Sequence, residues 1–166
     1  MPENAMKEMR IEKVVLNIGC GKDKNPDHAA KILKSISGKD VVITKTHKRS
    51  TFGVAKNKAI GSMITIRKGS AELLKKMFAA VDNKIKARNF DNKGNFAFGI
   101  IEYTMVPGMR YDPNIELMGL DVCVTMERPG YHVKKKRLFT KIGKNHVIKK
   151  EESIEWVKKN FNVKVE

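Results

Sequence analysis

Residues 62–85 read SMITIRKGSAELLKKMFAAVDNKI, and within this stretch the spacing of the apolar residues changes abruptly. Ile64 and Ile66 stand two positions apart, which is typical of a strand with one buried face. From Ser70, a good helix N-cap, apolar residues recur at helical spacing as far as Ile85. A strand that leads straight into an amphipathic helix predicts a sheet with helices packed on it.

The same two patterns recur on both sides of this stretch. Alternation predicts strands over residues 10–18, 41–45, 62–68, 96–103 and 115–127. Helical spacing predicts two more helices over 29–36 and 152–161, and Asn25 followed by Pro26 suits the start of the first. The sequence therefore predicts an α+β fold, a two-layer sandwich of a mostly antiparallel sheet with helices packed on one face.

Strict alternation also assigns side chains to the two faces of the predicted sheet. In the first strand it groups Glu12 with Val14, Leu16 and Ile18 on the core side. The opposite face is expected to be open to solvent or to a ligand, and it would carry Asn17, Thr65 and Arg67.

The 166 residues fit one domain, and no repeat or linker marks a second folded unit. Within it we expect an exposed loop at 84–95, a basic insertion at 130–149 and a C-terminal helix at 152–161. Cys20 and Cys123 each lie in an apolar run, which predicts two buried thiols rather than a disulfide framework. No apolar run approaches the roughly 20 residues that cross a bilayer, so we expect a soluble intracellular protein without a membrane partner.

The net charge is +16, from 34 basic and 18 acidic residues, and it is unevenly distributed. Residues 31–69 hold ten basic residues and one acid, and residues 134–150 hold eight basic residues and none. Such surfaces favour a polyanionic partner, and no long basic amphipathic helix supports a membrane surface instead. Phosphate contacts in the second region are expected from Lys134, Lys135, Lys136, Arg137, Lys141 and Lys144.

The basic segment from Thr44 to Arg67 has features that suit folded RNA. Phe52 can stack on a base, Gly53 and Gly61 permit close backbone approach, and small hydroxyl and amide side chains can bond phosphate and 2′-OH groups. Charge alone would also fit a solvated basic loop. The sequence offers no recognition-helix pattern for a DNA groove, although a DNA-compacting module stays open as an alternative.

Catalytic and metal-binding motifs are missing from the sequence. Gly21 before Lys22 lacks the earlier glycine of a phosphate loop, the four histidines are scattered, and neither cysteine stands at zinc spacing. Nothing resembles a nucleophile with an ordered base. We expect no enzyme, cofactor or metal, and a hydrolase or transferase with its residues drawn from distant positions is the remaining alternative.

Four blocks stand in a specific order: RIEKVVLNIG at 10–19, ITKTHKRSTFGVAKNKAIGSMITIRKGSAELL at 43–74, NFDNKGNFAFGI at 89–100 and LMGLDVCVTMERPGY at 117–131. Together they resemble the large-subunit ribosomal protein five family, which binds 5S rRNA, over roughly residues 9–161. The basic insertion after Gly130 and the closing helix with Trp156 resemble the archaeal branch.

This resemblance implies a structural protein of the cytoplasmic ribosome that holds 5S rRNA at the central protuberance. Implied partners are 5S rRNA, large-subunit rRNA, peptidyl-site tRNA, neighbouring large-subunit proteins and a small-subunit protein. For 5S rRNA the resemblance points to Asn17, Lys45, Lys48, Arg49, Ser50, Phe52, Lys56, Lys58, Thr65 and Arg67. For the loop near peptidyl-site tRNA and the small subunit it points to Lys84, Lys86, Arg88, Asn89, Phe90, Lys93 and Asn95.

Overall fold

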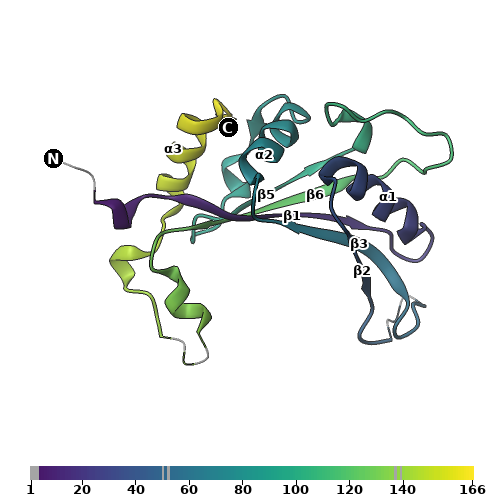
Figure 1. Ribbon diagram of the computed structural model, residues 1–166, viewed down its shortest axis with the longest axis horizontal. Helices are drawn as coiled ribbons and strands as arrows, with labels where there is room; N and C mark the ends of the chain where they lie inside the picture. The colour runs from purple at the N-terminus through teal and green to yellow at the C-terminus, as the bar shows by residue number, and fades with distance from the viewer. Residues whose placement is uncertain (1–3, 50, 52, 137, 139) are drawn as a thin grey trace.

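The computed structural model describes residues 4–49, 51, 53–136, 138 and 140–166, and it is built on one five-stranded antiparallel sheet (Figure 1). The strand order is β2-β3-β1-β6-β5. The bounds are Arg10–Gly19 for β1, Val42–Lys45 for β2, Ala59–Ile66 for β3, Phe96–Ile100 for β5 and Leu120–Glu127 for β6. A second, parallel pair joins β4, Lys84–Ile85, to β7, Lys164–Val165.

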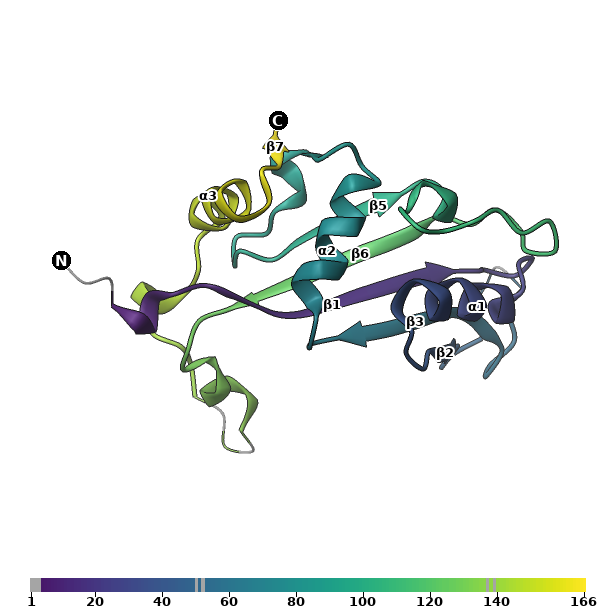
Figure 2. The ribbon, with the colours of Figure 1, turned by 45° about the horizontal axis from the view of Figure 1, so that its top comes forward.

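Three helices, α1 (Pro26–Ser37), α2 (Ser70–Ala79) and α3 (Lys150–Phe161), lie on one side of the five-stranded sheet (Figure 1). Short 3-10 turns fill connections at Ala5–Lys7, Ala87–Asn89, Tyr103–Met105, Tyr131–Lys135 and Lys144–His146. The second view, Figure 2, shows α1 and α2 side by side above the strands. The predicted α+β sandwich with helices on one face is confirmed.

The core forms where β1, the central strand, faces the helices. Val14, Leu16 and Ile18 are fully buried, and they meet Ile64 and Ile66 of β3 and the apolar stripes of α1 and α2. Burial of each of these side chains contributes about 1.5–3 kcal/mol to stability, because its apolar surface is removed from water. This face is therefore the main source of stability of the sheet.

The alternation predicted for β1 is wrong at Glu12. A bulge between Ile11 and Lys13 leaves Glu12 without a cross-strand partner, while Ile11 pairs with Met126 and Lys13 with Thr125. An extra residue in one strand reverses the alternation beyond it. Glu12 therefore lies beside Glu127, on the face away from the helices. Both carboxylates form ion pairs with the Lys135 ammonium there.

Helix α2 is shorter than the apolar spacing predicts. Gly69, at φ 76°, occupies the N-cap position that the sequence suggests for Ser70, and Ser70 itself is a buried first helical residue. The helix ends at Ala79 because Asp82 and Asn83 take left-handed backbone angles, at φ 52° and 54°. Acid and amide side chains tolerate this region best, so the chain leaves the helix there and Ile85 enters β4 instead.

Residues 84–95 are less exposed than expected, because the C-terminal segment packs on them. The amide of Ala87 donates to the Glu166 carbonyl at 2.5 Å, and the amide of Glu166 donates to the Ile85 carbonyl at 3.0 Å. The Ser153 hydroxyl of α3 donates to the Gly94 carbonyl at 2.7 Å. This segment is therefore held by residues that come much later in the chain.

The connection between β5 and β6 takes residues that alternation assigns to strands. β5 ends at Ile100 rather than residue 103, and β6 begins at Leu120 rather than residue 115. Tyr103 turns into the core and is 1% exposed, which interrupts the strand. Gly119 has backbone oxygens of Ile100 and Ile101 within 3.0 Å of where a Cβ would stand, so the chains cross too closely there for a regular ladder.

Arg128, directly after β6, anchors the basic insertion to the rest of the fold. Its buried guanidinium donates to the Lys7 carbonyl at 3.1 Å, the His146 carbonyl at 3.3 Å and a Glu152 carboxylate oxygen at 2.9 Å. The Tyr131 hydroxyl adds a bond to the same His146 carbonyl at 3.1 Å. Arg128 thus links the start of the insertion to its end and to α3.

Candidate nucleic-acid interface

The face of the sheet away from the helices is open, and its centre carries uncharged side chains together with the exposed acid Asp121. Val15 stands between Thr65 and Cys123, and Asn17 stands between Met63 and Asp121. Small side chains continue across β5, where Ala97 and Gly99 are exposed. The structure thus brings the predicted residues Asn17 and Thr65 to one hydrogen-bonding surface, with an apolar floor suited to sugars and bases.

The prediction that both thiols are buried is wrong for Cys123. Cys20 is buried, whereas Cys123 points to the open face of β6 and is exposed. An apolar run in a strand has two faces, and only one of them packs under the helices. Partial burial between neighbouring strands raises the pKa of the Cys123 thiol above its ordinary value, and the carboxylate of Asp121 adds to this shift.

The loop between β2 and β3 carries the cations that the sequence singles out. It is closed at its base by Thr46, whose hydroxyl donates to the Ala55 carbonyl at 2.7 Å and accepts from the Lys58 amide at 3.1 Å. The exposed cations are Lys45, Lys48, Arg49, Lys56 and Lys58, and none of them forms an ion pair with the described residues. Ser50 and Phe52 lie outside the described residues.

Arg67 does not belong to this loop cluster. It follows the last residue of β3, whereas Lys58 precedes the first, and the eight strand residues between them separate the two positions by roughly 30 Å. Arg67 is exposed at the far end of the open face. The predicted 5S-binding residues therefore form a line along β3 rather than one patch.

The structure adds Lys22 to these cations. In the sequence, Lys22 is notable only as part of an incomplete phosphate-loop motif. The turn after β1 lies against the β2–β3 loop, where the Lys58 ammonium donates to the Lys22 carbonyl at 3.2 Å. The Lys22 ammonium is exposed beside Gly53. The two segments are far apart in sequence, so only their antiparallel neighbours β1 and β3 bring them together.

Residues 84–95 divide into an exposed cationic set and a buried set. The exposed cations are Lys84, Lys86, Arg88 and Lys93, and Asn89 is half-buried. Phe90 is 4% exposed and stacks near Phe96, so its assignment to an exposed loop is wrong. The Asn95 side chain accepts the Met126 amide at 3.2 Å, which gives it a role in holding the strand ends together.

Part of the predicted basic insertion is neutralised within the protein. Lys135 is paired with Glu12 and Glu127, and the hydrogen bond to Glu12 raises the pKa of the Lys135 ammonium. The Lys134 ammonium lies over the Tyr131 ring at 5.2 Å from its centroid. Lys136, Lys141 and Lys144 are exposed, and Arg137 lies outside the described residues.

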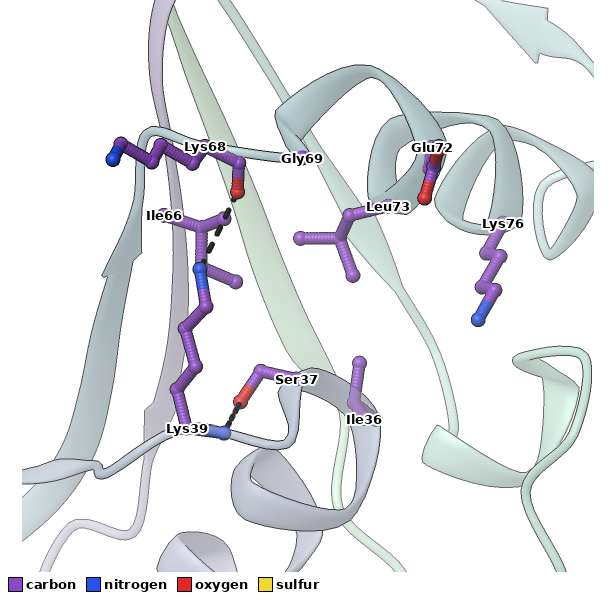
Figure 3. A pocket seen from close by; sticks show the side chains of 9 residues that line it. All are labelled: Ile36, Ser37, Lys39, Ile66, Lys68, Gly69, Glu72, Leu73 and Lys76. Atoms are coloured by element: carbon purple, nitrogen blue, oxygen red, sulfur yellow. Dashed lines mark hydrogen bonds between the residues drawn. The ribbon is translucent and has the colours of Figure 1, made fainter.

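A shallow hollow of about 230 Å³ lies between the end of α1 and the start of α2 (Figure 3). Its apolar floor is formed by Ile36, Ile66 and Leu73, and Lys39 reaches across it to donate to the Lys68 carbonyl at 3.3 Å. Glu72 is the acid in its lining, and no nucleophile with a base lies among the residues described there.

The described residues contain no group of three or more histidine, cysteine or acidic side chains placed to hold a metal ion. In the same part of the chain, every helix falls short of the length and apolar character that a bilayer crossing requires.

Comparison with known proteins identifies relatives along almost the whole chain. Residues 4–54 match the family described as ribosomal protein L5, and residues 59–156 match the model of the C-terminus of that ribosomal family. The chain belongs to the ribosomal protein L5 family. Large ribosomal subunit protein uL5 of Sulfolobus acidocaldarius is 41% identical, covering 98% of this chain and 94% of the relative.

Other members of the L5 family show similar agreement. The uL5 proteins of Nanoarchaeum equitans and Methanococcus vannielii are 42% and 39% identical, over 98% and 96% of this chain and 99% and 92% of the relatives. The resemblance drawn from the four sequence blocks is confirmed. Membership of the family makes this chain a structural protein of the large ribosomal subunit in the cytoplasm, not an enzyme.

Proposed function

We propose that this chain binds 5S rRNA and helps to attach it to the large subunit at the central protuberance. The observation that carries the proposal is the β2–β3 loop, where five exposed cations lack an ion pair among the described residues. Unpaired lysines and arginines displace condensed counterions from phosphates, which drives RNA binding. The adjoining sheet face supplies hydrogen-bonding groups from Asn17 and Thr65.

The placement of the cationic segments suits a folded RNA rather than an extended strand. The β2–β3 loop and the insertion extend from opposite ends of the sheet, both on the side away from the helices (Figure 1). An RNA helix lying over the sheet would reach cations at both ends. We assign additional rRNA contacts to Lys134, Lys136, Arg137, Lys141 and Lys144, with Lys135 acting first to fix the insertion through Glu12 and Glu127.

Contact with peptidyl-site tRNA and the small subunit is proposed for residues 84–95. Lys84, Lys86, Arg88 and Lys93 offer charge there, and Asn89 and Asn95 lie partly exposed beside them. Phe90 is reassigned to the core, where it supports the segment from below. The pairing of β4 with β7 gives this segment a fixed shape before any partner arrives.

The β5–β6 connection favours neighbouring ribosomal proteins as further partners. Ile101 is 77% exposed, and Met105, Tyr111 and Leu117 are also exposed. Residues 101–119 hold three acids, Glu102, Asp112 and Glu116, against one base, Arg110, in a chain whose net charge is +16. An acidic and apolar surface repels phosphates and complements a basic protein.

A salt titration of 5S rRNA binding tests the main proposal. If about six phosphates are neutralised, the slope of log K against log salt should be about −4 to −5. The double variant K48Q/K56Q should reduce that slope by roughly 1.4–1.8, while K158Q/K159Q, which removes equal charge from α3, should leave it almost unchanged. Equal effects of the two variants, or a flat salt response, would contradict the proposal.

Competition with duplex DNA separates this function from a DNA-compacting module. A 5S-specific protein keeps its RNA in the presence of excess duplex DNA, because the sheet-face hydrogen bonds discriminate between the two. Equal displacement by both competitors at the same salt concentration would favour the DNA-binding alternative.

A further inference from the structure

The turn that follows β1 is fastened to the base of the β2–β3 loop. The amides of Cys20 and Gly21 both donate to the Ile60 carbonyl, at 2.8 and 3.2 Å. The Lys58 ammonium reaches the Lys22 carbonyl at 3.2 Å. Both segments emerge at the same end of the sheet, as Figures 1 and 2 show.

The Lys22 side chain reaches the β2–β3 loop beside Gly53. Its Nζ is 3.6 Å from the point that a Cβ on Gly53 would occupy. Gly53 has φ +77°, a conformation that L side chains rarely adopt, so the glycine sets the backbone shape of the loop at the point where Lys22 meets it. Lys22 therefore extends the cationic surface of the loop from a separate segment.

The charges gathered here lack compensation within the described part of the protein. The Lys58 ammonium makes one hydrogen bond to a carbonyl and keeps two N–H groups, and Lys22 is exposed. Asp23 is the neighbouring acid, and it forms no ion pair with the described residues. Two cations at the same end of the sheet repel, and a phosphate bound between the turn and the loop reverses the sign of that interaction.

Lys24, two positions further on, is directed differently. Its ammonium donates to the Leu117 carbonyl at 3.0 Å, on the β5–β6 connection. Lys22 and Lys24 thus share a turn and a charge, but only Lys22 lies beside the β2–β3 loop. This difference provides a matched pair of positions for an experiment.

We propose that Lys22 and Lys58 together form a phosphate-binding site for structured RNA, in which the β1–α1 turn contributes one side and the β2–β3 loop the other. The proposal rests on the RNA-binding function proposed above and adds to it a binding residue from a second segment. A phosphate oxygen held there would receive N–H groups from two directions, which fixes the register of the RNA on the sheet.

The test compares K22Q with K24Q in salt titrations against isolated 5S rRNA. K22Q should weaken binding roughly three- to five-fold at about 0.1 M salt and reduce the magnitude of the slope by about 0.7–0.9. K24Q should leave the slope unchanged. K22R should restore it, since a guanidinium also binds phosphate. Circular dichroism of each variant confirms that the fold is intact.

The possible results are distinguishable. Equal slopes for K22Q and K24Q, whether reduced or unchanged, would overturn the assignment of Lys22, because they would make its position irrelevant. The proposed 5S binding would still be judged separately by K48Q/K56Q. If those loop variants lose binding while K22Q behaves like the wild type, the RNA-binding function stands and this second side of the site does not.

Discussion

At the scale of single residues, buried and half-buried charges hold the projecting parts of the molecule in place. Arg128 joins the N-terminal segment, the insertion and α3 through three hydrogen bonds. Glu127, beside it in the sequence, receives Arg10 and Lys135 on the open face. Neither role is visible in the sequence, because the partners of these side chains are distant in the chain.

Replacing Arg128 with glutamine should lower the free energy of unfolding by about 2–4 kcal/mol, because the Lys7 carbonyl loses its donor while the His146 carbonyl and the Glu152 carboxylate each lose one of two. The Glu152 side chain is 40% exposed, which keeps the loss below that of a fully buried pair. Urea denaturation measures the change. Arg10→Gln is the control, since its side chain is 62% exposed, and it should cost less than about 1 kcal/mol. Similar losses for the two variants would contradict the anchoring role.

The Glu127 carboxylate should make the attachment of the insertion depend on pH. Burial alone would raise the pKa of Glu127, but hydrogen bonds from Arg10 and Lys135 outweigh it and hold the pKa below its ordinary value of 4.5. A lowered pKa contributes stability that is complete above the ordinary value and is lost as pH falls through the folded-state value. The free energy of unfolding of the wild type should therefore exceed that of Glu127→Gln at about pH 6, and the difference should shrink toward about pH 3.

At the scale of elements, the parallel pair of β4 and β7 is the feature that sequence patterns cannot supply. Two-residue strands carry no periodicity, and their pairing joins Lys84 to Lys164 across the chain. The pair fixes residues 84–95 through backbone bonds to Ile85 and Ala87. It therefore determines how the exposed cations of that segment are presented.

Deleting residues 164–166 should release this segment without unfolding the sheet. The amide of Ala87 would lose its acceptor, and the Ile85 carbonyl would lose its donor. Hydrogen exchange followed by NMR should show faster exchange at Ala87, with Leu16 in β1 unchanged as the internal control. Unchanged protection at Ala87 would show that the pairing does not hold the segment.

The open face of the sheet can be tested through Cys123. Its raised pKa keeps the thiol protonated at neutral pH, so alkylation of the free protein should be slow and should accelerate as pH rises. Cys20 is buried and should not react in the folded state. If RNA lies over the sheet, bound 5S rRNA should protect Cys123, whereas an unchanged alkylation rate would place the RNA elsewhere. Mass spectrometry of the modified chain, with Cys123→Ser as a blank, gives the rate.

The elements with strong local periodicity are the ones that the sequence predicts well. The alternation around Ile64 and Ile66 is confirmed, as is the burial of Val14, Leu16 and Ile18, and the start of α2 lies one residue from its predicted place. The end of α2 depends on left-handed angles at Asp82 and Asn83, which many sequences with the same residues do not adopt.

In the candidate site too, the sequence predicts the residues that lie close together in the chain and misses those that strand pairing brings together. Composition and charge locate the β2–β3 loop, because its lysines and arginines lie close together in the sequence. Lys22 escapes prediction because its position depends on the antiparallel pairing of β1 with β3, and the bulge at Glu12 depends on the register with β6. Phe90 is predicted to face solvent because β7 and α3, which help cover its segment, come at the end of the chain.

At the scale of the whole molecule, the fold separates its functions by face. Helices and apolar residues occupy one side of the sheet, and the two cationic projections occupy the other (Figure 1). The acidic β5–β6 connection meets the β1–α1 turn through the Lys24 hydrogen bond to Leu117 but lies on the helix side of the sheet, so phosphates and basic proteins are attracted to different faces. A protein with this arrangement can join RNA to its neighbours without the two kinds of partner competing.

The net charge of +16 should make the stability of the free protein depend on ionic strength. Raising sodium chloride from about 0.02 to 0.2 M shortens the screening length and weakens self-repulsion, so the Tm should rise by about 2–4 °C. Differential scanning fluorimetry measures the shift, and K48Q/K56Q should show a smaller one. A Tm that falls over this range would show that attractive ion pairs, rather than repulsion, dominate the surface.

The pairing of Lys84 with Lys164 also determines which parts of the chain can fold first during translation. A nascent polypeptide leaves its own ribosome from the N-terminus, so β1 and β3 can pair while translation of the later codons continues. Residues 84–87 must wait until residues 164–166 have been added before their partner strand exists. Residues 84–87 therefore reach their final conformation after the sheet has formed. A chain truncated shortly before residue 164 would have a folded sheet without the β4–β7 pair.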